Sequence, residues 1–551
     1  MRKNLGKWLL VWPPQAYLLF FFLVPALIML FASFRFPGDY GGLAPWMYSE
    51  DGQTVYDLSV ENYTRLTESW VYLQLFVKSF GYALVTTLAC LLLAYPVATT
   101  LARAPAKWRN LLILLVILPF WSNLLVRVYA WMIILSPSGA LTRGINAALD
   151  LFGAQPISLM FTPFAVILCM VYVHLPFMIL PLYANLEKHD PALLDAAQDL
   201  GAGRWQRFWR VTFPLSLPGV AAGAALVFIP VLGMFAIPDL VGGTDGIMIG
   251  NLIKSQFLDS RDWPFGSALS IALTGCILLL VALGMGAARA RKEAPMRRPY
   301  LLWSATALVY LFLYVPLVIV VLYSFNDSRL NAEWVGFTLD WYRKLFGNRD
   351  MLQAAANSLV IALVSASVAT LLGTLAGVAL HRFKLRVLPL LVLTPIAIPE
   401  LLMGVSLVIF FIGLNMSLGM LSVTLAHITF SVGFVALVVQ ARMSGMDESL
   451  TEAARDLGAT PWQSFRLVTL PLIMPGIVAG ALMAFTLSID DFVITFFTAG
   501  GGFATLPTQI YTMIKIAVTP EVNAVSTLLM LLTLVLIVIA SKLSPSAIKG
   551  H

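Results

Sequence analysis

Twelve runs of apolar residues, most of them close to 20 residues long, divide this chain and restrict the folds that are open to it. A helix of that length spans the hydrocarbon core of a bilayer, since it rises about 1.5 Å per residue. Only 11% of the residues are charged, against about a quarter in soluble domains. We therefore expect an all-α polytopic membrane protein with twelve transmembrane helices. The expected spans are 15–34, 79–102, 110–135, 163–186, 215–237, 266–288, 302–325, 358–380, 387–412, 419–441, 472–496 and 522–541.

One polar stretch occurs twice among these runs. Residues 195–220 read DAAQDLGAGRWQRFWRVTFPLSLPGV and residues 452–477 read EAARDLGATPWQSFRLVTLPLIMPGI, with 15 of 26 positions identical and no gap. The chain therefore contains an internal repeat, with six apolar runs in each half. The predicted halves are 1–290, with the polar loop 187–214, and 301–551, with the loop 442–471. A charged linker, 291–300, separates them.

The basic residues set the expected orientation. They gather before the first run, in both repeat copies and between the halves, whereas the loop after the first run carries acidic residues such as Asp57 and Glu61. Basic loops remain on the cytoplasmic side, so both termini and both repeat copies are expected there. The N-terminal run is read as an uncleaved span rather than a secretory signal. Six spans per half make the halves parallel, which suits a pathway between them.

The repeated loop carries helix start and stop signals. In the second copy, Thr460 to Gln463 forms a capping box with Pro461 at the first helical position, and Gly458 is placed to end the preceding helix. Two short helices should meet there at a glycine elbow, with Ala453 and Ala454 leaving a flat face for another protein. Gly203 replaces the capping threonine in the first copy. Two equal loops imply a partner with two equal faces.

The loop resembles the EAA loop of bacterial ABC importer permeases, in which E-A-A, three residues and a glycine precede L-P-x-x-x-P-G. The resemblance implies a MetI-like, type I permease fold and a coupling helix that docks on an ATPase. The residues that it places in ATPase coupling are Asp195, Ala196, Ala197 and Gly201 in the first copy, and Glu452, Ala453, Ala454 and Gly458 in the second.

No catalytic motif accompanies this loop. The chain lacks the G-x-x-x-x-G-K-[ST] phosphate loop, and its five histidines are scattered. We therefore expect a transport component rather than an enzyme, with no metal and no cofactor of its own. ATP and Mg would be bound by a separate partner subunit.

Charged residues within the apolar runs are candidates for the solute pathway, because a charge is costly in lipid. Glu400 directly follows Pro395 to Pro399 in the middle of span 9, and Asp490 and Asp491 lie in the outer part of span 11. Adjacent helical residues point about 100° apart, so the two aspartates face one lumen only where the helix breaks. An internal ion pair with Arg127 is the structural alternative. The remaining candidates are Arg127, Asp239 and the aromatic residues Trp121, Tyr129 and Trp131.

Longer motifs resemble polyamine permeases. In the first half, LPFWSNLLVRVYAW and IPDLVGGTDGIMIGNLIKSQFL are similar to the B/H type; in the second, TPIAIPELLMGVSL and FTLSIDDFVITFF are similar to the C/I type. The resemblance implies both permeases fused in one chain of a bacterial inner membrane. It also implies an ATPase homodimer, a periplasmic binding protein and a cationic solute such as putrescine or spermidine.

Two alternatives remain open at this point. Putrescine-type relatives tend to carry a glutamate where this chain has Met234, so an opine, an aminophosphonate or an amino acid-like zwitterion is a second candidate solute. A secondary transporter with twelve spans is the alternative machine, although it would not need twin docking loops. No nucleic acid is expected as a partner.

Overall fold

The computed structural model describes residues 2–50, 53–120, 122–189, 197–287, 300–328, 334–447, 449–516 and 520–543. These residues are mostly helical, with one short antiparallel hairpin. The chain divides into two compact units. Unit 1 comprises 1–31, 346–510 and 535–551, and unit 2 comprises 32–345 and 511–534.

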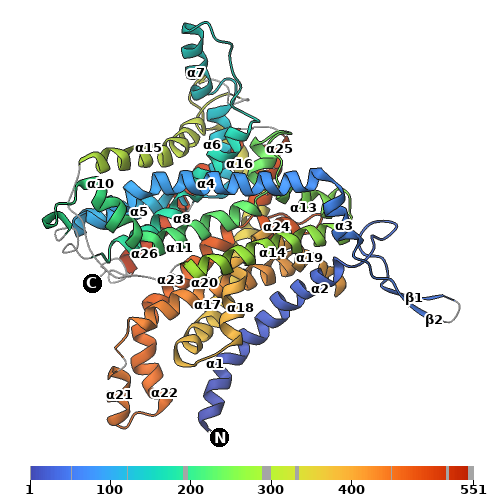
Figure 1. The fold of residues 1–551 in the computed structure, drawn as a ribbon, viewed down its shortest axis with the longest axis vertical. Helices are drawn as coiled ribbons and strands as arrows, with labels where there is room; N and C mark the ends of the chain where they lie inside the picture. The colour runs from blue at the N-terminus through green and yellow to red at the C-terminus, as the bar shows by residue number, and fades with distance from the viewer. Residues whose placement is uncertain are drawn as a thin grey trace. The chain divides into compact units, whose positions relative to one another are not determined.

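Unit 1 is built around the long helix α17, which packs against α20 and α23 (Figure 1). The N-terminal helix α1 also packs against α17, and the Tyr17 hydroxyl donates a hydrogen bond to the Leu425 carbonyl at 2.9 Å. The first apolar run therefore belongs to the unit that holds the spans of the second half. The elements are α1 Arg2–Leu18, η1 Leu19–Leu23, α2 Val24–Ala32, α17 Arg349–Arg382, α18 Val387–Ala397, α19 Glu400–Gly413, α20 Met420–Ser444, α21 Ser449–Asp456, α22 Pro461–Ser464, η3 Phe465–Thr469, α23 Leu470–Asp490 and α24 Val493–Thr498.

Unit 2 is built around α4, which packs against α8, α11 and α15. The elements are β1 Met47–Glu50, β2 Gln53–Tyr56, α3 Glu61–Glu68, α4 Trp70–Arg103, α5 Ala106–Phe120, α6 Leu124–Leu135, α7 Ala140–Leu151, α8 Pro163–Leu186, α10 Arg204–Arg207, η2 Phe208–Thr212, α11 Phe213–Leu232, α12 Ala236–Val241, α13 Ile249–Leu258, α14 Trp263–Ala287, α15 Tyr300–Tyr323 and α16 Asp340–Gly347. Two further helices cross the division between the units, α25 Leu506–Ile516 and α26 Pro520–Leu543.

The helix α15 is joined to unit 2 by specific polar contacts. Thr306 donates to Thr100 at 2.8 Å, and the Tyr314 hydroxyl donates to the Leu115 carbonyl at 2.8 Å. Leu115 lies four residues before Pro119, which has no N–H to satisfy that carbonyl within the helix. Tyr314 supplies the missing donor. The first helix of the second sequence half thus packs among the spans of the first half, so the compact units cross the boundaries at 290 and 301.

Among the described residues, ten helices are long and apolar enough to span a membrane, or eleven when a bent pair is counted as one span. The exact count of twelve spans is therefore not confirmed, and two of the predicted spans are interrupted. Span 3 is two helices, α5 and α6, and span 9 is two helices, α18 and α19, which meet at 110°. Prolines near both breaks explain them, because proline removes a helical hydrogen bond. The last predicted span lies in α26, which is 24 residues long.

Candidate functional site

Both copies of the repeated loop contain the same helix end. The N–H of Gly201 bonds to the Gln198 carbonyl and that of Ala202 to the Ala197 carbonyl, each at 2.9 Å. In the second copy, Gly458 and Ala459 repeat these bonds to residues three and five positions back, at 2.9 and 3.0 Å. This is a Schellman motif, which requires a left-handed residue. Gly201 and Gly458 have φ of +81° and +90°, so the predicted glycine elbows are present.

The helix that follows each elbow begins differently in the two copies. Thr460 and Gln463 form the predicted reciprocal capping box, with bonds of 2.9 and 3.3 Å. In the first copy, Gln206 still accepts a bond from the Gly203 N–H at 3.2 Å, but a glycine has no side chain to complete the box. The second elbow is therefore capped by one more hydrogen bond than the first.

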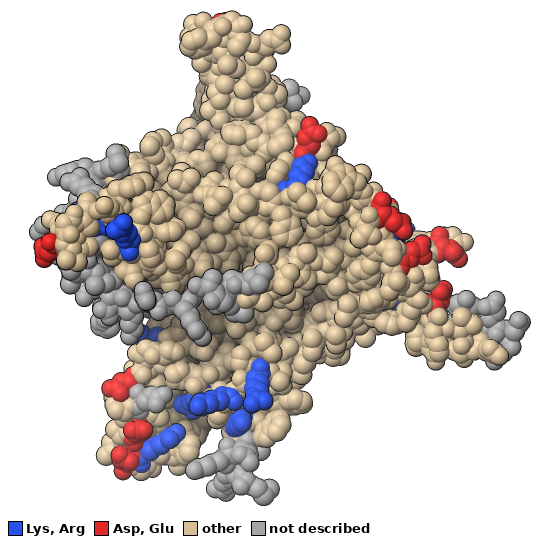
Figure 2. Space-filling view, in the orientation of Figure 1, with Lys and Arg blue, Asp and Glu red and all other residues tan. Residues whose placement is uncertain are grey.

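The elbows expose apolar side chains. Leu200 and Leu457 are equivalent in the repeat and are 88% and 90% exposed, and the equivalent residues Trp205 and Trp462 are also exposed. Figure 1 shows α21 and α22 projecting beyond α23, and Figure 2 shows Lys and Arg side chains gathered around this end of unit 1. Large apolar side chains that project in the same way from two copies are typical of a docking surface.

The predicted coupling residues lie on or beside these elbows. Glu452, Ala453 and Gly458 are exposed, Ala454 is half-buried, and Ala197 and Gly201 occupy the matching places in the first copy. Asp195 and Ala196 lie outside the described residues.

The rest of the repeat fixes each loop to its span. A widened π turn precedes Pro214 and Pro471, at Phe208–Thr212 and Phe465–Thr469, and gives room to the proline ring. The final glycine of the motif then lies against the preceding span. A Cβ at Gly219 would be 2.6 Å from the Cβ of Asn185, and one at Gly476 would be 2.8 Å from that of Arg442. Both contacts explain why the motif ends in glycine.

Glu400 occupies the break in span 9. It is the first residue of α19, after Pro399 in extended conformation (φ −56°, ψ 139°), and its side chain is half-buried. The corresponding break in span 3 has the same backbone geometry, since Asn123 precedes α6 with φ −53° and ψ 139°. The first residue of α6, however, is the apolar Leu124. A carboxylate at a helix N-terminus interacts favourably with the helix dipole, so the break is a suitable place for Glu400.

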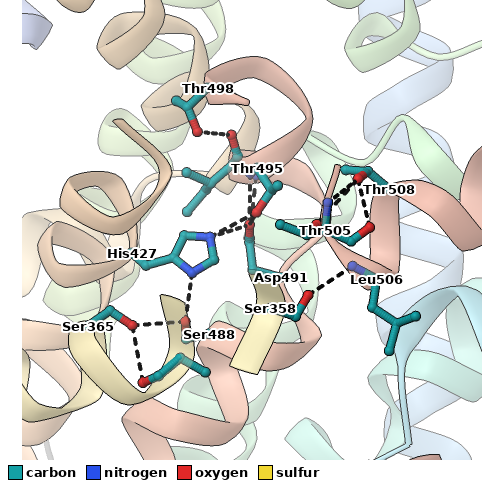
Figure 3. Close-up of polar contacts among 12 residues, drawn as sticks. Ser358, Ser365, His427, Ser488, Asp491, Thr495, Thr498, Thr505, Leu506 and Thr508 are labelled. Carbon is teal, nitrogen blue, oxygen red and sulfur yellow. Dashed lines mark hydrogen bonds and ion pairs between the residues drawn. The ribbon is translucent and has the colours of Figure 1, made fainter. Parts of the chain in front are cut away.

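The helix also breaks between the two aspartates of span 11. Asp490 is the last residue of α23 and Asp491 lies in the connection to α24. Asp491 is buried and accepts hydrogen bonds from the Thr495 N–H and the Thr495 hydroxyl, each at 2.8 Å (Figure 3). Asp490 is half-buried at the helix end. Because the helix ends between Asp490 and Asp491, the separation of about 100° between adjacent helical residues does not apply to them.

His427 also contacts the Asp491 carboxylate. His427 Nε2 lies 3.1 Å from Asp491 Oδ2, and His427 Nδ1 lies 2.7 Å from the Ser488 hydroxyl. Ser488 in turn contacts Ser365 at 2.9 Å (Figure 3). Because a carboxylate only accepts, Nε2 carries the proton and Nδ1 accepts from Ser488. The chain of bonds ties α17, α20 and α23 to the start of α24, so Asp491 is committed to the fold.

Glu400 lies close enough to interact electrostatically with both Asp491 and Asp490. Within the described part of the chain, no hydrogen bond or ion pair joins the Glu400 carboxylate to another residue. The described residues also contain no group of three or more His, Cys, Asp or Glu side chains placed to hold a metal ion. Glu400 and Asp490 are thus neighbouring acids that can attract a cation with separated charges, rather than enclose a metal ion.

The first repeat lacks this polar network. The copies begin at Asp195 and Glu452, 257 positions apart, and the same offset relates the flanking helices. At that offset the places of His427, Ser488, Asp491 and Thr495 are taken by Met170, Val231, Met234 and Pro238. The intramembrane acids are therefore a property of the second half alone.

The aromatic candidates that the structure describes are buried in unit 2. Arg127, Tyr129 and Trp131 all lie on α6 and are buried. Trp131 packs edge-on against Tyr172, with ring centroids 5.7 Å apart, and Phe312 covers both rings. The rings of Trp131, Tyr172 and Phe312 thus pack against one another. Trp121 lies outside the described residues.

Asp239 lies on α12, after span 5, and has two lysine partners. Its Oδ2 is 2.9 Å from the Nζ of Lys254 and 2.9 Å from the Nζ of Lys515, and it also accepts from the Tyr511 hydroxyl. Burial raises the pKa of the Asp239 carboxyl, but the hydrogen bonds from Tyr511, Lys254 and Lys515 outweigh it, so the pKa is lowered overall. Asp239 is therefore ionised, and the ammonium groups of Lys254 and Lys515 compensate its negative charge.

Sequence reasoning missed four residues of these sites: His427, Lys254, Tyr511 and Lys515. His427 was one of five scattered histidines, and its only signal is its position in an apolar run. Lys254 and Lys515 lie 261 positions apart in the chain, and nothing in the spacing joins them to Asp239.

Comparison with known proteins gives a consistent picture. The family model described as binding-protein-dependent transport system inner membrane component matches residues 71–331 and, separately, residues 369–547. The spermidine/putrescine transport system permease protein PotB of Escherichia coli (strain K12) is 49% identical over 227 residues, which are 40% of this chain and 81% of PotB. The corresponding PotC of the same organism is 41% identical over 246 residues, which are 44% of this chain and 93% of PotC.

A solved structure is also similar to part of the chain. It is the crystal structure of a bacterial ABC transporter involved in the import of the acidic polysaccharide alginate. The TM-score is 0.37 at 19% identity, and the match covers 52% of this chain and 96% of that chain.

Proposed function

Because the chain belongs to the family of binding-protein-dependent transport system inner membrane components, with the family region present twice, we propose that it forms the whole translocation pathway of an ABC importer for a small organic cation. PotB and PotC are named as separate permeases of one spermidine/putrescine system, and each covers less than half of this chain. A polyamine is accordingly the proposed solute.

The observation that carries this proposal is the pairing of Glu400 with Asp490 beside two breaks in the spans. Both side chains are half-buried and interact electrostatically, and the Glu400 carboxylate has no hydrogen bond or ion pair among the described residues. Two neighbouring carboxylates of this kind favour a solute with positive charges, because attraction is stronger where water is scarce. Asp491 would not contact the solute, since its Oδ2 is already bonded to Thr495 and His427 and its Oδ1 accepts from the Ile494 N–H.

The exposed elbows support a proposal for the partner subunits of the transporter. In this proposal the exposed Leu200 and Leu457 enter matching sites on a homodimeric ATPase, which binds ATP and Mg and hydrolyses ATP. We propose that the elbows and both chain termini are cytoplasmic, which the basic residues around both elbows support. A periplasmic binding protein delivers the solute to the opposite side.

Reconstitution tests the proposal directly. The full chain, its ATPase and its binding protein are placed in proteoliposomes, and uptake of radiolabelled putrescine and spermidine is measured with and without ATP. We expect ATP-dependent uptake that a proton gradient alone does not support. Uptake that persists without ATP would assign the chain to the secondary transporters, whereas competition by an opine or an aminophosphonate, but by neither polyamine, would reassign the solute.

A further inference from the structure

In unit 2, three side chains contact one carboxylate oxygen of Asp239. Asp239 Oδ2, on α12, is 2.9 Å from the ammonium nitrogens of Lys254 on α13 and Lys515 on α25, and it accepts from the Tyr511 hydroxyl. Asp259 interacts electrostatically with Tyr511, so a second acid lies near this cluster. Nothing in the permease role of the docking loops or of Glu400 uses this cluster.

The two lysines are held very differently. The Lys254 side chain is only 12% exposed, and its ammonium lies 5.6 Å from the ring centroid of Phe235 and 6.0 Å from that of Tyr511. The Lys515 side chain is 51% exposed, in the last turn of α25. An exposed ion pair contributes little to stability, because water and salt compete for both charges. Lys515 is therefore the partner of Asp239 that another cation can replace.

The chemistry of the lysine side chain says which cation that would be. Each lysine ends in a primary ammonium group on an alkyl chain, the same group that ends a linear polyamine. A primary ammonium donates up to three hydrogen bonds and can take the place of Lys515 without leaving Asp239 uncompensated. A neutral or anionic solute cannot make this exchange, and a quaternary ammonium cannot donate the hydrogen bond.

We propose that Asp239 is an outer binding point for a primary ammonium group of the solute, and that this group displaces the ammonium of Lys515. The inference rests on the proposed function and deepens it, because it adds a second acidic contact for the solute, in unit 2. Lys254 and the rings of Phe235 and Tyr511 remain in place and form the wall of the site.

Equilibrium binding tests this without transport. The full chain with its ATPase is placed in nanodiscs without binding protein, and binding of tritiated putrescine is measured. We expect Lys515→Gln to tighten binding by about fivefold, because it removes the competing ion of a weak exposed pair. Asp239→Asn should weaken binding by at least about tenfold, since a charge-assisted bond is lost. The double variant should match Asp239→Asn, and the bis-trimethylammonium analogue of putrescine should not compete.

A matched control lies in the same unit. Asp262→Asn also removes an acid from an ion pair, that with Arg65 at 2.9 Å, and should leave binding unchanged. Unchanged binding in Asp239→Asn, weaker binding in Lys515→Gln, or undetectable binding in the unaltered protein would each overturn the inference. The proposed function fails by a different result, namely the absence of ATP-dependent polyamine uptake by the unaltered protein in proteoliposomes.

Discussion

Nε2 of His427 lies 3.1 Å from Oδ2 of Asp491, and both side chains are almost fully buried in unit 1. This contact decides which of the intramembrane acids belongs to the fold. Asp491 Oδ2 is bonded to His427 and Thr495, while the Glu400 carboxylate has no hydrogen bond or ion pair among the described residues. Residues that looked alike in the sequence therefore have different chemistry.

Replacement of His427 should destabilise the protein. His427→Met, which places the first repeat's residue at this position, leaves Asp491 and Ser488 without their shared partner, and a buried polar group that loses its bond costs about 1–3 kcal/mol. Thermal unfolding of the purified protein measures the effect. Ser431→Ala on the same helix is the control, because its buried hydroxyl has no partner in the described part of the chain. Equal unfolding temperatures for the two variants would contradict the role of His427.

Neutralisation of Glu400 should impair transport without impairing assembly. Glu400→Gln keeps the shape of the side chain and removes one of two neighbouring charges, so putrescine uptake in proteoliposomes should fall by about tenfold or more, the equivalent of about 1.4 kcal/mol. Asp350→Asn, in the exposed first turn of α17, provides the control and should transport normally. Normal uptake by Glu400→Gln would remove this residue from the pathway.

The elbow glycine should be essential for coupling. Gly458 has φ +90°, a conformation that side chains rarely adopt, although a Cβ there would meet open space. Gly458→Asp should therefore distort the elbow and abolish uptake and co-purification of the ATPase, while the spans remain folded. Gly445→Ala, at φ −93° in the same loop, should retain both properties. An ATPase that still co-purifies with Gly458→Asp would argue against docking at the elbow.

The exposed leucines should contribute equally to docking. Leu200→Ser and Leu457→Ser each remove one apolar contact, and the double variant removes both. We expect each single variant to weaken ATPase binding by about tenfold, since burial of a leucine contributes about 1.5–3 kcal/mol. Leu421→Ser, which changes an exposed leucine at the opposite end of α20, should have no effect on that affinity. A large effect of only one leucine would mean that the two loops do not dock in the same way.

Low pH should weaken the cluster around Asp239. Its pKa in the folded protein is lowered from the usual value of 3.8, so the stability that it contributes is complete above that value and is lost as the pH falls through the lowered pKa. The difference in unfolding stability between the unaltered protein and Asp239→Asn should be constant at neutral pH and should shrink below about pH 4. A difference that instead shrinks as the pH rises towards 8 would assign the effect to another group.

Much of the fold was predictable because its signals are local. The apolar runs, the capping box at Thr460 and the stop at Gly458 each depend on a few adjacent residues, and the structure confirms them. The breaks in spans 3 and 9 were not predicted as breaks, although Pro119 and Pro399 are visible in the sequence. A proline can kink a transmembrane helix or end it, and the choice depends on which neighbour satisfies the freed carbonyl, as Tyr314 does for Leu115.

The sequence by itself determined that this is a repeated, membrane-spanning chain with two equal elbows, since hydrophobicity, repetition and helix capping are read along the backbone. Only the tertiary structure decided that α1 packs in the unit of the second half, that His427 holds Asp491, and that Lys254 and Lys515 meet at Asp239. These contacts join residues from 15 to several hundred positions apart, and their strength depends on burial and on the absence of competing water. Neither quantity is encoded at any single position.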